Sequence, residues 1–228
     1  MKNRNLGSVN SKMLTGAGIM AALAIVVSFA TSFIKIGYLS LDAGDIIIVL
    51  ASFVYGPIVG VAISLVSSLV SMIYSGTMFW GMLMDFFSSA IFSFTASFIY
   101  RRRKSFNMAI IGIYSSVVVT AALMMPLNIL ITPLYTPVTT AFVLAQIPIM
   151  LLPFNFLKCL FNGGAVLLIY KPLVRALRQA KLVSLPSDCE PSERASRPLT
   201  NTKKSVILGS VTVLVASALL FVLYLLNR

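Results

Sequence analysis

A lysine and an asparagine lie close together inside a long apolar segment. The local sequence is Leu151-Leu-Pro-Phe-Asn-Phe-Leu-Lys158, and the next charged residue downstream is Lys171. In a helix, Asn155 and Lys158 stand at positions i and i+3, so their side chains share one face. An ammonium group beside a carboxamide is a recognition surface for a polar molecule that carries carbonyl groups.

The depth of Lys158 supports a binding role. It precedes Lys171 by 13 residues, which in a membrane helix is roughly 20 Å from that interface. A cation at such a depth costs about 2.5–3.5 kcal/mol on insertion scales, so it normally faces a partner or a polar cavity. The alternative is a lysine that snorkels to the surface along its stem. Asn155 has no such stem, which favours a binding site.

Composition identifies a membrane protein. Of the 228 residues, 58% are hydrophobic and 11% are charged, whereas soluble domains carry about 25% charged residues. The net charge of +12 comes from basic clusters beside apolar runs, which is the positive-inside pattern and not a nucleic-acid surface.

The sequence excludes several kinds of chemistry. It has no histidine, and Cys159 and Cys189 have no CxxC neighbour, so we expect no metal, redox centre or cofactor. It also lacks a nucleotide-binding glycine loop and a relay of carboxylates. These features predict a binding subunit that is driven by other proteins, without enzyme activity.

Apolar runs predict an all-α polytopic fold with a six-helix core and one further helix. The expected spans are near 13–34, 40–55, 57–75, 82–100, 107–132, 145–170 and 205–226. A cytoplasmic N-terminus places the basic clusters 101–104 and 171–181 inside, and leaves the loops 35–44, 76–81 and 133–144 outside. Domains are expected at 1–181 (substrate binding), 182–204 (a polar, disordered linker) and 205–228 (the additional helix).

Further polar residues fall in the outer half of the expected spans. Asn128 lies between Pro126 and Pro133, which disturb a helix, and Asp85 lies near the start of the fourth span. Asp85 is either a ligand contact or a structural ion-pair partner of Lys158.

Small residues predict helix packing. Ser64, Ser67 and Ser68 form a stripe on the third span, and Ala17 and Ala21 form a similar face on the first. The aromatic residues at the outer ends, Tyr38, Trp80 and Tyr135, are expected to anchor the chain at the interface.

Four stretches carry a family resemblance. They are Leu41-Asp-Ala-Gly-Asp45, Tyr55-Gly-Pro-Ile-Val-Gly60, Asn128 with Pro133-Leu-Tyr135, and Pro153-Phe-Asn-Phe-Leu-Lys158. From about residue 13 to residue 181 the chain resembles the substrate-binding (S) components of energy-coupling factor (ECF) transporters, especially the riboflavin-specific group. It departs from that group at Ser64, Ser67 and Ser68, where members often carry a glutamate and a Lys-Asn pair, and in its tail.

The resemblance implies a pocket open to the outside and capped by the first outer loop. Asn128, Asn155 and Lys158 would contact the flavin ring system, and the substrate site would also include Asp85 and, from the cap, Tyr38 and Leu41. Riboflavin is then a transported substrate and not a cofactor.

The resemblance also implies partners: two ATPases and a transmembrane coupling protein, onto which Ala17 and Ala21 would dock, in the plasma membrane of a prokaryote. Two alternatives stay open. One is an S component for another vitamin or a modified base, and the other is a small membrane enzyme or assembly subunit with a structural Asp85–Lys158 pair.

Overall fold

The computed structural model describes residues 11–33, 35–36, 39–75, 78–103, 105–179 and 200–226. Its elements in chain order are α1 (Ser11–Thr31), β1 (Lys35–Ile36), β2 (Leu39–Ser40), α2 (Gly44–Tyr55), α3 (Pro57–Ser75), α4 (Met78–Arg102), α5 (Phe106–Tyr135), α6 (Thr140–Gln146), the π-helix η1 (Ile147–Leu151), α7 (Leu152–Gln179) and α8 (Thr200–Leu226). The predicted α-helical class is confirmed, and β1 and β2 add a short antiparallel hairpin that the sequence did not predict.

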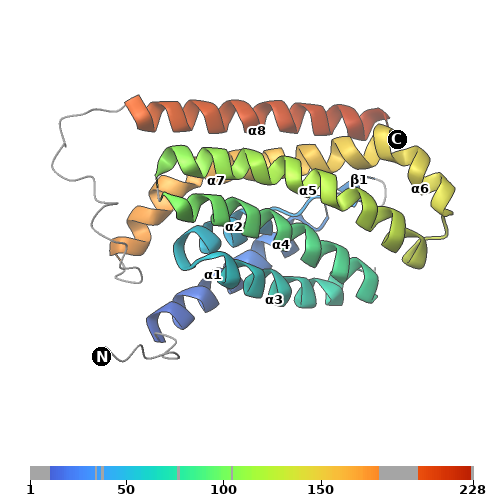
Figure 1. The fold of residues 1–228 in the computed structure, drawn as a ribbon. Helices are drawn as coiled ribbons and strands as arrows, with labels where there is room; N and C mark the ends of the chain where they lie inside the picture. The colour runs from blue at the N-terminus through green and yellow to red at the C-terminus, as the bar shows by residue number, and fades with distance from the viewer. Residues whose placement is uncertain are drawn as a thin grey trace.

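Five stretches within the described residues are long and apolar enough to cross a membrane. They are Met13–Thr31, Pro57–Tyr74, Phe79–Arg102, Asn107–Leu134 and Thr140–Tyr170. Two further apolar helices, Gly44–Tyr55 and Ile207–Val222, are shorter. Figure 1 shows α8 along α7 on one side of the bundle, with α1 and α3 on the other.

The second span was predicted too long. α2 has 12 residues, about 18 Å at 1.5 Å per residue, which is too short to cross a bilayer alone. Asp42 defines its start, because Asp42 Oδ1 accepts hydrogen bonds from the Gly44 N–H and from Ser28 Oγ, both at 2.7 Å. Its end is defined by Gly56, whose φ of 112° lies in the region that favours glycine.

The third outer loop is shorter than predicted. α5 continues through Pro126 and Pro133 to Tyr135, and a new helix begins at Thr140. Thr139 caps that helix, since its hydroxyl accepts a hydrogen bond from the Phe142 N–H at 3.3 Å. The sixth span therefore starts with α6, before residue 145, and reaches α7 through η1.

α2 occupies the centre of the bundle. It packs against α1, α3, α4 and α7, and its apolar side chains Ile48, Val49 and Leu50 are fully buried. A polar residue on α2 is consequently held among protein groups and not in lipid.

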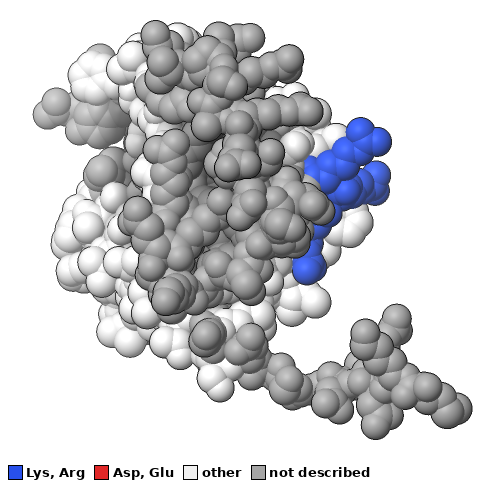
Figure 2. Space-filling model, turned by 90° about the vertical axis from the view of Figure 1, so that its left-hand side faces the viewer, with Lys and Arg blue, Asp and Glu red and all other residues white. Residues whose placement is uncertain are grey.

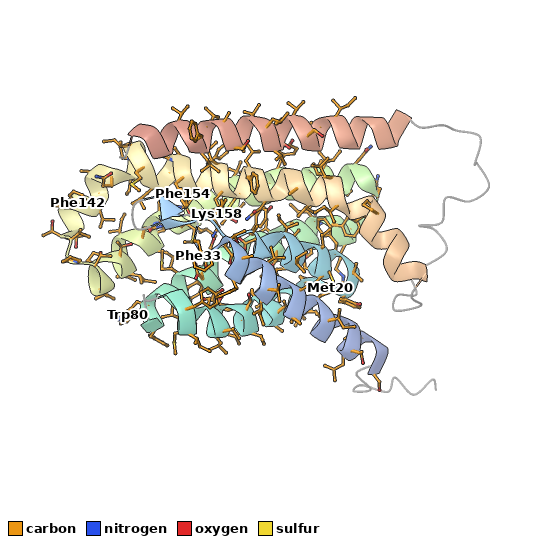
Figure 3. The ribbon with its side chains drawn as sticks, turned by 180° about the vertical axis from the view of Figure 1, so that it is seen from behind. Met20, Phe33, Trp80, Phe142, Phe154 and Lys158 are labelled. Atoms are coloured by element: carbon orange, nitrogen blue, oxygen red, sulfur yellow. The ribbon has the colours of Figure 1, made fainter. Side chains whose placement is uncertain are left out.

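The two ends of the bundle differ in composition. Figure 2 shows one end, where the exposed Arg101, Arg102 and Arg103 gather. Trp80 and Phe142 both lie at the other end of the bundle (Figure 3), which we call the tryptophan end. Exposed arginines and an exposed tryptophan are both typical of the ends of membrane-spanning helices.

Candidate functional site

The centre of the site is a buried ion pair between α7 and α2. Lys158 Nζ lies 3.7 Å from Asp45 Oδ2, and both side chains are almost completely buried. Figure 3 shows Lys158 in the interior of the bundle, with Phe154 nearer to the tryptophan end. Lys158 was expected to stay in the interior and not to extend to the membrane surface. Its burial confirms this expectation.

Two further side chains fix the Asp45 carboxylate. Ser89 Oγ, on α4, donates a hydrogen bond to Asp45 Oδ1. Asn162 Nδ2, on α7, donates to Asp45 Oδ2 at 3.2 Å. Both carboxylate oxygens are therefore engaged, which a buried charge needs to be tolerated.

The network extends to the segment that precedes α2. Asn162 Nδ2 also donates to the backbone oxygen of Asp42 at 2.8 Å. The Asp42 side chain in turn holds Ser28 on α1. Polar contacts thus connect α1, α2, α4 and α7 around Lys158.

The ammonium group of Lys158 keeps hydrogen-bonding capacity. Its 3.7 Å separation from Asp45 exceeds the 2.7–3.2 Å of a direct N–H···O bond, and an ammonium has three donors. Asp42 and Asp85 also lie near enough to attract it. An uncharged ligand with carbonyl oxygens can therefore bind to Lys158 without displacing Asp45.

Of the two roles considered for Asp85, a direct ion pair with Lys158 is absent from the described residues. The direct partner of Lys158 is Asp45, whereas Asp85 Oδ2 accepts a hydrogen bond from Ser71 Oγ on α3 at 3.3 Å. Ser89, one turn further along α4 than Asp85, reaches the ion pair instead. Asp85 therefore interacts with Lys158 only over a longer range.

Both candidate asparagines are buried. Asn155 Nδ2 donates to the Leu151 oxygen at 2.8 Å, in the π-helical turn that precedes α7. Asn128, on α5, donates to the Met124 oxygen at 2.7 Å and accepts from Thr132 Oγ1 at 3.2 Å. α5 packs against α7, so the two helices that carry the asparagines are neighbours.

Comparison with known proteins identifies the family. The family model "ECF transporter, substrate-specific component" matches residues 12–174. The chain belongs to this family. As an S component it is a multi-pass membrane protein that binds a small-molecule substrate and associates with the other components of an ECF transporter.

Two curated relatives and one solved structure resemble this S component. The riboflavin transporter RibU of Staphylococcus aureus (strain TCH60) is 28% identical over 184 residues, which cover 77% of this chain and 97% of the relative. The riboflavin transporter FmnP of Bacillus subtilis (strain 168) is 24% identical, covering 64% and 83%. A structure described as the S component of a bacterial ECF transporter aligns with a TM-score of 0.63 and 29% identity, covering 74% of this chain and 98% of that chain.

The remaining described residues that were predicted to contact the substrate, a partner or a neighbouring helix lie outside the ion-pair network. Leu41 packs against a cluster that includes Phe154, whereas Tyr38 is outside the described residues. Ala17 and Ala21 are half-buried against the central core, which leaves only part of each for a partner. The stripe of Ser64, Ser67 and Ser68 is buried, as expected for helix packing.

Three residues of the site were missed. From the sequence, Asp45 was assigned only to the start of a span, and Ser89 and Asn162 were not predicted to be site residues. Asn162 stands seven positions after Asn155 and four after Lys158, so helical spacing alone would have placed it on the same face. No comparable signal identifies Ser89, because α4 contains several serines.

Proposed function

We propose that this S component binds riboflavin, or a close flavin, from outside the cell and delivers it for uptake. The observation that carries the proposal is the buried Lys158, whose ammonium keeps free donors one turn away from Asn155. The two curated relatives are both named as riboflavin transporters, which supports the choice of ligand.

The pyrimidine edge of the flavin ring fits these side chains. It presents two carbonyl groups with an N–H between them. Lys158 donates to a carbonyl oxygen, and Asn155 Oδ1 accepts from the N–H. Asn128 contributes an amide from the neighbouring helix. Such a site rejects molecules without this pattern, because its buried polar groups would then be left unpaired.

Apolar residues near the asparagines supply surfaces for the faces of the ring. Met84, Met124 and Ile131 form a buried cluster between α4 and α5, against which Met125 packs. Methionine sulfur and aromatic carbon make favourable contacts. Leu41 belongs to the segment between the hairpin and α2, so this segment is the cap over the ligand, with Tyr38 as a further contact and Asp85 near the pocket wall.

Transport requires the rest of the complex. The sequence has no nucleotide-binding loop, so uptake depends on a transmembrane coupling protein and two ATPases. The half-buried Ala17 and Ala21 contribute to the contact with the coupling protein. The N-terminus and the arginine end face the cytoplasm of a prokaryotic cell, since cytoplasmic segments are rich in Lys and Arg. The chain itself performs no bond chemistry.

Spectroscopy of the purified chain tests this function. The detergent-solubilised protein is titrated with riboflavin, and absorbance and flavin fluorescence are recorded. Quenching that saturates near one ligand per chain supports the proposal. If flavin fluorescence stays unchanged at micromolar ligand, riboflavin is not the substrate, and other vitamins are then screened with the same protein.

A further inference from the structure

α8 makes a close helix contact with α7. A Cβ atom on Gly209 would lie 2.9 Å from the backbone oxygen of Gly164 and 2.8 Å from Leu168 Cγ. Only glycine fits at such a distance, and small residues at a crossing let membrane helices approach each other closely. α8 is therefore seated on α7 and not merely tethered to the core.

The contact continues toward the tryptophan end. Ala216 is fully buried, and Leu220 joins Met150, Phe154 and Leu157 in one buried cluster. The spacing of Gly209, Ala216 and Leu220 places them on one face of α8. The positions beside this stripe, which include Leu219, are exposed. α8 therefore packs against α7 through this single stripe, and the exposed positions beside it do not pack against the bundle.

This stripe lies directly behind the polar residues of the site. Phe154 and Leu157 precede Asn155 and Lys158 by one position each, so on α7 the apolar and polar faces are adjacent. Leu41, which we assign to the cap, packs against the same cluster. One apolar cluster thus joins α8, the ligand-bearing turn of α7 and the cap.

α8 lies beyond the part of the chain that defines the family. The family model ends at residue 174, and α8 begins at Thr200. The support that α8 gives to α7 is therefore an addition of this chain to the shared six-helix architecture.

We propose that α8 is a clamp that slows ligand release, and that Leu220 is a positioning residue acting through Phe154 and Leu157. This inference rests on the proposed riboflavin site. Release requires the cap and the outer part of α7 to separate, and that motion disrupts the packing of the cluster. Leu220 adds to this packing, so its removal speeds dissociation more than it slows association, as is usual for packing changes at a binding site.

The test compares two neighbouring leucines in the full-length chain. Leu220→Ala removes the clamp contact, and Leu219→Ala makes the same chemical change on the exposed face of α8. The dissociation rate of riboflavin is measured from the recovery of flavin fluorescence after dilution. We expect about a three- to tenfold faster rate for Leu220→Ala, an unchanged rate for Leu219→Ala, and a rate near wild type for Leu220→Met, which conserves volume.

Thermal unfolding separates positioning from plain stability. If Leu220 only stabilises the fold, Leu220→Ala lowers the unfolding midpoint equally with and without riboflavin. A positioning role also reduces the increase in midpoint that the ligand produces. Equal dissociation rates for the two alanine variants and wild type overturn the clamp while leaving the riboflavin site intact. A wild-type chain that binds no riboflavin overturns the proposed function itself, and the clamp with it.

Discussion

Lys158 on α7 and Asp45 on α2 form a buried ion pair, with Nζ and Oδ2 3.7 Å apart. Ser89 and Asn162 donate hydrogen bonds to the Asp45 carboxylate. The Lys158 ammonium has N–H donors that no described group accepts at hydrogen-bond distance. The same lysine therefore has a structural role and, in the proposed function, a binding role, and variants have to separate the two.

A double-mutant cycle measures the structural role. Lys158→Met or Asp45→Asn alone leaves one buried charge without its partner, which costs about 3–5 kcal/mol. The double variant removes both charges, so we expect it to be at least about 1 kcal/mol more stable than the sum of the single changes predicts. The readout is thermal unfolding of the ligand-free protein in detergent.

Asp85 provides the matched control for this cycle. Asp85→Asn combined with Lys158→Met removes a carboxylate that is hydrogen-bonded to Ser71 and lies outside the ion pair. We expect a smaller coupling than for Asp45. A larger coupling with Asp85 than with Asp45 would contradict the pairing described here.

The binding role is tested at Asn155. Asn155→Ala removes an acceptor for the flavin N–H but only one hydrogen bond within its own helix. We expect the riboflavin Kd to rise about tenfold, equivalent to 1.4 kcal/mol, with little change in the ligand-free unfolding midpoint. Leu152→Ala, at an exposed position three residues earlier on α7, is the control and leaves Kd unchanged. Equal affinities of both variants and wild type would remove Asn155 from the site.

Much of this arrangement was predictable because polar residues stand out in an apolar chain. Asn128, Asn155 and Lys158 were all selected on that basis, and all three are buried. The partner of Lys158 was not predictable. It depends on which helices pack together, and the central position of the short α2 is a property of the whole bundle.

The packing of α8 against α7 could not be predicted from the sequence for a different reason. In a helix of a soluble protein the buried face is apolar and the exposed face polar, so the spacing of apolar residues indicates which face packs. In α8 both faces are apolar, and Leu219 and Leu220 differ only in their surroundings. Gly209 is the one clue, and a glycine in a membrane helix does not indicate which partner it approaches.

Asn162 is expected to hold the segment before α2 in place. Its amide nitrogen donates to both Asp42 and Asp45, while its Oδ1 has no partner among the described residues. Asn162→Ala removes both hydrogen bonds within the interior, for which we expect a loss of about 1–3 kcal/mol in unfolding free energy. Ser217→Ala is the control, because Ser217 is exposed and bonds only to its own helix. If both variants unfold at the same temperature, the Asn162 bridge contributes nothing to the fold.

Gly56, the single residue between α2 and α3, is expected to be sensitive to substitution. Its φ of 112° and ψ of 165° belong to a region that is almost exclusive to glycine and costs other residues about 1–3 kcal/mol. An added Cβ would also lie 3.2 Å from the guanidinium carbon of Arg101. We therefore expect Gly56→Ala to lower the unfolding midpoint by several degrees, at about 2–4 °C per kcal/mol.

Gly18→Ala is the matched control. Gly18 is helical and an added Cβ meets nothing within 4 Å, so alanine there leaves the midpoint unchanged or raises it. A Gly56→Ala protein as stable as Gly18→Ala would show that the turn adopts another backbone conformation, and the start of α3 would then have to be reassigned.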